Sequence, residues 1–249
     1  MMKSKWSWSL IIAVIFVLTA VFLVSAGEGL ETVEEARYAF HAGEYQEAEE
    51  LWQQVLELEN YHWEANFFLG MTYLRLNDYQ AGVEYMSEAY QLRPEDYSTL
   101  VNYARLLYRN QQREEAREVL QEVPEDMREQ DEQYYNLRGL LAMAEDDLER
   151  ATASLEIAVE INPDNYHVRN NLGLANIRKG NFADAVDHLE EAVAQEPAEA
   201  YIYNNLGVAY ENLTELEPAR ENYERALELD PDYERAELNL ERVTARLEN

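Results

Sequence analysis

Asparagines recur in this chain at a spacing that could support binding chemistry. Asn170-Asn171 is followed by Leu-Gly, and the same four residues return 34 positions later at Asn204-Asn205. Asn102 and Asn136 fall in the same frame in earlier segments. A carboxamide offers both a donor and an acceptor, which are the groups that pair with the backbone of an extended peptide. The first question is therefore which elements place these amides together.

Residues for other kinds of chemistry are not grouped. The chain has no cysteine, so thiol nucleophiles, disulfides and thiolate metal sites are impossible. The four histidines, His41, His62, His167 and His188, are scattered, and none forms an HExxH motif. No P-loop, GxSxG elbow or dinucleotide-type glycine motif is present. We expect no enzymatic activity, no cofactor and no metal.

The charge balance restricts the partners. Fifty acidic residues against 20 basic ones give a formal net charge of −30, which argues against nucleic acid and against adhesion to an anionic membrane surface. Only three of the basic residues are lysines: Lys3, Lys5 and Lys179. An acidic, lysine-poor surface suits high salt, where self-repulsion is screened. An arginine-favouring genome explains the composition equally well, so a saline habitat stays one of two hypotheses.

The N-terminus predicts export. A short segment containing Lys3 and Lys5 precedes Leu10–Val24, whose only polar member is Thr19, and the small residues Ser-Ala-Gly follow. Residues 1–26 are either a signal peptide, cleaved after Ala26, or a single transmembrane anchor. Trp6 to Ala26 would form about 31 Å of helix, enough to span a bilayer. Either way, the lysines stay inside and the chain beyond residue 27 lies outside the cytoplasm. It would be anchored in the cytoplasmic membrane and face the periplasm or the exterior, or be secreted.

The rest of the chain consists of internal repeats. The eighth residue of each 34-residue unit is small: Ala36, Gly70, Ala104, Gly139, Gly173 and Gly207. Twelve residues later a second small residue recurs: Ala48, Gly82, Ala116, Ala151, Ala185 and Ala219. These positions define six units, 29–62, 63–96, 97–130, 132–165, 166–199 and 200–233, with only Asp131 outside the 34-residue register. Each unit carries two helix-period apolar patterns joined by a turn.

This pattern resembles the tetratricopeptide repeat family over essentially everything beyond the export segment. We therefore predict an all-α fold of six helix pairs with a C-terminal capping helix, preceded by the N-terminal hydrophobic helix. The family implies that the solenoid is right-handed. Pro124 predicts that the second helix of repeat 3 stops early, and the polar linker after it suggests a hinge. The predicted parts are residues 29–130, residues 131–233 and the cap at 234–249.

The resemblance also implies that the first helix of each pair lines a concave groove. We expect Asn102, Asn136, Asn170, Asn171, Asn204 and Asn205 on this groove, together with the arginines Arg75, Arg105, Arg109 and Arg178. The asparagines would bind a peptide backbone, or instead bond within the helix pair or to water. The arginines would hold carboxylates of a client, or instead pair with neighbouring acids and helix ends. Trp63, Phe67 and Phe68 are either an aromatic shelf or core between repeats.

The predicted function is a non-catalytic scaffold that binds a protein or peptide client in envelope or secreted complex assembly. If the N-terminal segment is uncleaved, the chain is also attached to the membrane. The alternative is a structural protein that self-assembles into homo-oligomers and has no peptide client.

Overall fold

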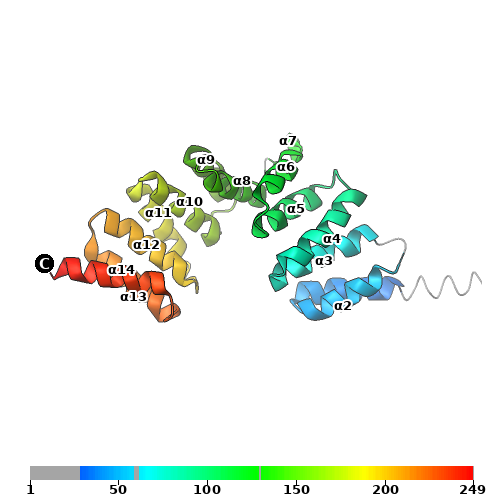
Figure 1. Cartoon of the computed structure of the whole chain (residues 1–249), viewed down its shortest axis with the longest axis horizontal. Helices are drawn as coiled ribbons and strands as arrows, with labels where there is room; N and C mark the ends of the chain where they lie inside the picture. The colour runs from blue at the N-terminus through cyan, green and yellow to red at the C-terminus, as the bar shows by residue number, and fades with distance from the viewer. Residues whose placement is uncertain (1–28, 59–61, 129, 249) are drawn as a thin grey trace, which may run out of the picture. The chain divides into compact units, whose positions relative to one another are not determined.

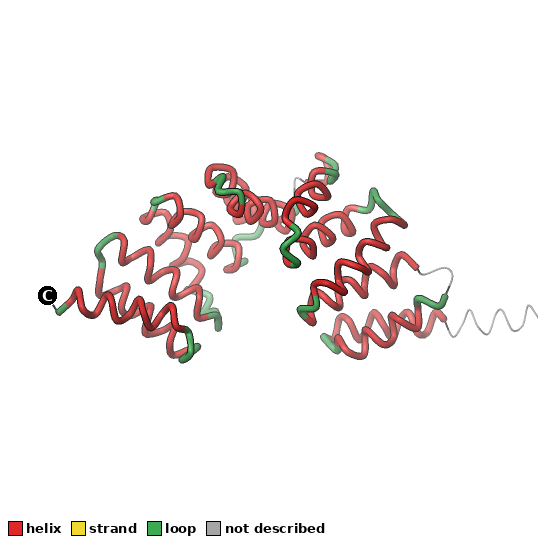
Figure 2. The backbone as a smooth tube through the Cα atoms, viewed as in Figure 1, coloured by secondary structure: helices red, strands yellow, loops and turns green. Residues whose placement is uncertain are grey.

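The computed structural model describes residues 29–58, 62–128 and 130–248, and within these residues every regular element is a helix (Figures 1 and 2). The chain divides into two compact units, residues 1–119 and 120–249, which are described separately below. The predicted N-terminal hydrophobic helix, at residues 1–26, lies outside the described residues. None of the described helices is long and apolar enough to cross a membrane.

The first unit contains three helix pairs in sequence order. The helix at 29–42 pairs with α2 (Tyr45–Val55), α3 (His62–Leu76) with α4 (Tyr79–Leu92), and α5 (Tyr97–Arg109) with α6 (Arg113–Gln121), which ends just past the boundary. The second unit contains α7 (Glu125–Arg128), α8 (Glu132–Ala144), α9 (Leu148–Ile161), α10 (Tyr166–Lys179), α11 (Phe182–Val193), α12 (Ala200–Asn212), α13 (Leu216–Leu229) and α14 (Glu234–Leu247). Three of its helix pairs, α8–α9, α10–α11 and α12–α13, follow the repeat frame.

Side chains in the turns determine where the helices start. Asp78, Asp96, Asp147 and Asn165 are N-caps whose side-chain oxygens accept hydrogen bonds from backbone N–H groups of the first turn. Asp131, the residue outside the 34-residue register, caps α8 by accepting from the backbone N–H groups of Gln133 and Tyr134 at 2.7 and 3.1 Å. The extra residue thus starts a helix.

Repeat 3 departs from the other repeats as Pro124 predicts. Its second helix, α6, has 9 residues, whereas α4 and α9 have 14 each. The predicted polar linker is partly helical, because Glu125–Arg128 form the single turn α7. Arg128 Nε donates to the carbonyl of Val123 at 2.8 Å and so satisfies a backbone acceptor that the shortened helix leaves.

Small residues on the first helix of a pair face large ones on the second. A Cβ added to Gly173 would lie 2.5 Å from Leu189 Cγ, and one added to Gly207 would lie 2.5 Å from Tyr223 Cε1. Gly173 and Gly207 are needed here for close approach of the helices. The large partners Trp52, Met86, Leu155, Leu189 and Tyr223 are fully buried. Within each unit the core is therefore a series of layers, one per helix pair, and neighbouring layers of the same unit contact each other.

Candidate functional site

In the second unit, the first helices of successive pairs lie side by side. α8 contacts α10, α10 contacts α12, and α12 contacts the cap α14. Because these helices share one repeat frame, equivalent residues form rows that run across all four helices. The surface that these rows form is called the first-helix face here. It includes the half-buried residues Asn136, Asn171, Asn205, Leu140, Leu174 and Val208, and the buried asparagines Asn170 and Asn204.

The asparagines of this face form a hydrogen-bonded ladder between repeats. Asn171 Nδ2 donates to Asn136 Oδ1, Asn205 Nδ2 to Asn170 Oδ1, and Asn239 Nδ2 to Asn204 Oδ1, each at 2.9 Å. In every rung the asparagine at the sixth position of the repeat frame donates to the asparagine at the fifth position of the first helix before it. The ladder thus ties α8 to α10, α10 to α12 and α12 to α14.

Burial differs between the two asparagines of a rung. The acceptors Asn170 and Asn204 are 4% and 5% exposed, whereas the donors Asn171 and Asn205 are half-buried. A rung uses one N–H of the donor amide and the carbonyl of the acceptor amide. The carbonyl oxygens of Asn171 and Asn205 are not used by the ladder, so they are available to accept from a peptide N–H.

Asn102 does not extend the ladder into the first unit. Its Nδ2 donates to the carbonyl of Ser98 in its own helix at 2.8 Å. In the preceding repeat, Phe67 stands where the ladder would need an asparagine acceptor. Asn102 Oδ1 is buried and has no hydrogen-bond partner among the described residues.

Three of the predicted groove arginines contact the preceding repeat. Arg178 donates to the carbonyl of Met143 and to Asp146 Oδ1, both at 2.8 Å, and so caps the C-terminal end of α8. Arg109 lies over the ring of Tyr79, 4.7 Å from its centre, and donates to the Tyr79 hydroxyl. Arg105 Nη2 lies 3.8 Å from Met71 Sδ. Arg75 is exposed in the last turn of α3. Helix-end capping therefore accounts for Arg178.

Of the three aromatic residues considered for a shelf, Phe68 and Trp63 contact neighbouring repeats. Phe68 stacks on the buried Trp52 at 4.7 Å, with the rings nearly parallel. Trp63 stacks on Phe67, lies 4.1 Å from the guanidinium carbon of Arg93, and donates from Nε1 to Thr99 Oγ1 at 3.2 Å. Of the two interpretations, inter-repeat core is correct for Phe68.

An ion cluster at the C-terminal end of the array was not predicted from the sequence. Glu211, only 8% exposed, accepts two hydrogen bonds from Arg242 at 2.7 and 2.8 Å, one from Arg246 at 3.0 Å and one from the Tyr223 hydroxyl at 2.8 Å. The bonds from Arg242 lower the pKa of the Glu211 carboxyl against the opposing effect of burial, with Tyr223 and Arg246 adding to the lowering. This cluster fastens α14 to the last repeat.

Asn239 was not predicted either, although the 34-residue spacing of the repeats indicates it. It lies 34 residues after Asn205, so extending the repeat frame into the cap would have found it. No group of three or more His, Asp or Glu side chains among the described residues is arranged to hold a metal ion.

Comparison with known proteins identifies the repeat family. Models described as tetratricopeptide repeat match residues 73–141 and, separately, residues 33–97, 136–187 and 170–234. The chain belongs to the tetratricopeptide repeat (TPR) family. A search of curated proteins found no significant match.

Solved TPR structures share the fold at low sequence identity. A structure described as pilF of Pseudomonas aeruginosa aligns with a TM-score of 0.72 at 14% identity, over 88% of this chain and 97% of that one. YrrB, described as a TPR protein with an unusual peptide-binding site, aligns with a TM-score of 0.56 at 18% identity, over 74% and 95%. MamA from Desulfovibrio magneticus RS-1 aligns with a TM-score of 0.58 at 23% identity, over 68% and 94%. These similarities establish the fold.

Proposed function

We propose that this TPR protein is a non-catalytic scaffold that binds an extended segment of a protein client on the first-helix face of its second unit. The asparagine ladder carries this proposal. It holds a row of half-buried amides across four helices, and two of them, Asn171 and Asn205, keep a carbonyl that the ladder does not use. Regularly spaced amides match the backbone groups of an extended peptide.

The charge along this face supports a peptide client. The second unit contains 31 acidic and 11 basic residues, yet α8, α10 and α12 together contain only two carboxylates, one being Glu132 in the first turn of α8 and the other Glu211. The Glu211 carboxylate is buried and neutralised by two arginines. A peptide on this face would meet amides and the apolar surfaces of Leu140, Leu174 and Val208, and would avoid the acidic outer surface.

The ladder has a second role in this proposal. Its hydrogen bonds fix the stagger between neighbouring first helices, and the unused carbonyls therefore stand at fixed positions before a client arrives. Preorganisation of this kind reduces the entropy lost on binding. The same asparagines would thus serve both the packing of the repeats and the recognition of the client.

We further propose that the protein acts outside the cytoplasm, in the assembly of envelope or secreted complexes. The support is the sequence of residues 1–26, with two lysines before an apolar run. Intact-mass measurement of the chain purified from membrane and from soluble fractions tests this proposal. A membrane-bound chain of full mass indicates an anchor, and a mass that begins at Gly27 indicates a cleaved signal. A full-length chain in the cytoplasmic fraction would contradict export.

Site-specific photocrosslinking tests the binding face. A benzophenone amino acid replaces Leu174 on the first-helix face, or Ala183 on the exposed surface of α11 as the matched control. The expected result is a client crosslinked at position 174 and absent at position 183. Equal labelling at both positions, or labelling at 183 alone, would place the client elsewhere.

A further inference from the structure

The helix at 29–42, the first of the first unit, exposes two positions that are buried in the later repeats and in the cap. These are the third and tenth residues of each 34-residue repeat, both of which lie in its first helix. The buried third residues are Ala65, Thr99, Tyr134, Val168, Ile202 and Ala236. The buried tenth residues are Thr72, Leu106, Leu141, Ala175, Ala209 and Val243.

Within each unit, the second helix of the preceding pair covers these positions. Leu106 packs so closely on α4 that a Cβ added to Gly82 would lie 2.6 Å from Leu106 Cδ2. Val168 and Ala175 belong to one core cluster with Ala151, Leu155 and Ala158 of α9. In the cap, Val243 clusters with Ala219 and Tyr223 of α13. The third and tenth positions are thus the contact surface for a helix that comes before the pair.

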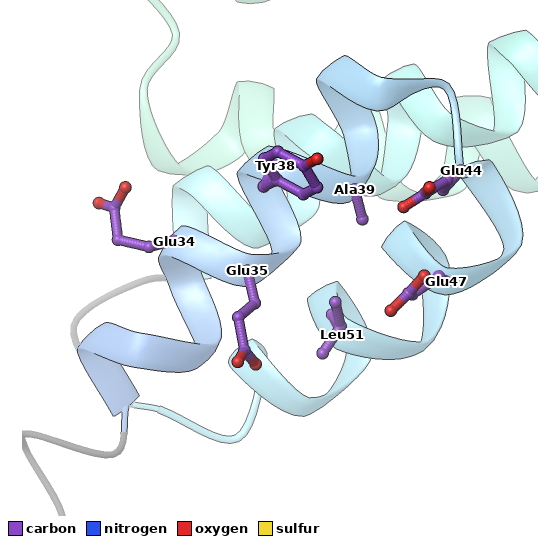
Figure 3. A pocket seen from close by; sticks show the side chains of 7 residues that line it. All are labelled: Glu34, Glu35, Tyr38, Ala39, Glu44, Glu47 and Leu51. Carbon is purple, nitrogen blue, oxygen red and sulfur yellow. The ribbon is translucent and has the colours of Figure 1, made fainter.

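In the first repeat these two positions are Glu31 and Tyr38, and both are exposed. Tyr38 is 72% exposed, the highest fraction for any large hydrophobic side chain in the described part of the chain. Beside Tyr38 is a hollow of about 440 Å³ between the helix at 29–42 and α2. Figure 3 shows the lining side chains coming from both helices: Glu34, Glu35, Tyr38 and Ala39 from the first, and Glu44, Glu47 and Leu51 from α2 and its cap. This surface is called the N-terminal end face here.

The N-terminal end face is acidic, and this charge favours a basic partner. Four of its seven lining residues are glutamates and none is cationic. Glu34 pairs with Arg37, which leaves Glu35, Glu44 and Glu47 to meet incoming charge. An apolar helix covering them would desolvate carboxylates without compensation, which is costly, whereas lysines or arginines at its edge would pair with them.

We propose that the N-terminal end face binds a cationic amphipathic helix of a partner protein. This helix would lie where the second helix of a preceding repeat lies elsewhere in the array. Its apolar side would cover Tyr38, Ala39 and Leu51, and its basic residues would pair with Glu35, Glu44 and Glu47. Because Tyr38 is larger than most residues at the tenth position in other repeats, the partner needs a small residue opposite it. The site is separate from the first-helix face and does not depend on the proposed client.

Fluorescence anisotropy tests this proposal with the full-length chain in mild detergent at about 0.15 M salt. The probe is a labelled helical peptide of alanine, leucine and lysine, and a peptide with glutamate in place of lysine is the reference. The wild-type chain should bind the lysine peptide and not the glutamate peptide. The double variant Glu35→Lys with Glu47→Lys should weaken binding of the lysine peptide about tenfold or more. Tyr38→Asp should also weaken binding of the same peptide.

The matched control is Glu217→Lys with Glu221→Lys, which changes the net charge by the same amount at exposed positions of α13. This control should bind the lysine peptide within about twofold of wild type, since only bulk charge has changed. Equal weakening by both pairs would show non-specific attraction to an acidic protein and would overturn the proposal. Failure of the wild-type chain to bind, or binding unaffected by the Glu35 and Glu47 pair, would overturn it as well. Circular dichroism confirms that each variant is folded.

Discussion

Replacing Asn170 by alanine removes the acceptor of the middle rung of the ladder. Asn170 is 4% exposed and its Oδ1 accepts from Asn205 Nδ2 at 2.9 Å. A neutral hydrogen bond contributes about 1 kcal/mol to stability, and leaving a buried partner unsatisfied costs about 1 to 3 kcal/mol. Asn205 is half-buried, so water partly replaces the lost acceptor. We therefore expect Asn170→Ala to lower the free energy of unfolding by about 1 to 2 kcal/mol.

Urea unfolding followed by far-UV circular dichroism measures this loss. With a slope of about 2 kcal/mol per molar urea, the midpoint should fall by about 0.5 to 1 M. Asn212→Ala is the matched control, because Asn212 is exposed and its Nδ2 donates to Val208 of its own helix. A double-mutant cycle of Asn170→Ala with Asn205→Ala isolates the rung, and its coupling energy should be about 1 kcal/mol. A coupling energy near zero, or an equal loss in Asn212→Ala, would refute the ladder as a tie between repeats.

Three further predictions concern stability. Glu211→Gln should cost about 2 kcal/mol at neutral pH, since the buried carboxylate accepts charged hydrogen bonds from Arg242 and Arg246. Because the folded-state pKa of Glu211 lies below the ordinary value of 4.5, its contribution is full above that pH and is lost as the pH falls through the folded-state pKa. Acid titration of the melting temperature should therefore show a shallower acid limb in the glutamine variant, and an unchanged limb would contradict the cluster. Gly207→Ala should cost about 1 to 3 kcal/mol in urea unfolding, because its Cβ would lie 2.5 Å from the ring of the buried Tyr223. Gly70→Ala should cost less, since the nearest atom is the flexible end of Met86 at 2.9 Å, and equal costs would argue against the close-approach explanation. With a net charge of −30, the melting temperature should rise with salt as repulsion is screened, and a flat response in thermal melts would exclude adaptation to a saline habitat.

The sequence alone was sufficient to predict the all-helical repeat fold. The packing contacts recur every 34 residues, because each helix pair needs the same small and large side chains in contact. This periodicity is visible in Gly173 and Gly207. Pro124 likewise predicted the short second helix of repeat 3, since proline removes a backbone donor wherever it stands.

The pairing of the asparagines could not be predicted from the sequence. Periodicity placed Asn170 and Asn205 on one face, but whether an amide reaches back to the preceding helix depends on the stagger between helices, which no local pattern records. The Glu211 cluster was missed for a related reason. Its arginines lie 31 and 35 residues away, in a cap whose orientation depends on packing against α12 and α13.

The affinity of variants for the client is the decisive measurement of binding on the first-helix face. Once crosslinking at position 174 identifies the client segment, calorimetry with the synthetic peptide compares Leu174→Glu with Ala183→Glu. Both variants add one negative charge, the first beside the ladder and the second on the outer surface of α11. We predict that Leu174→Glu weakens binding about tenfold or more, whereas Ala183→Glu binds with the affinity of the wild type. Equal affinities of the two variants would contradict a client site on the first-helix face.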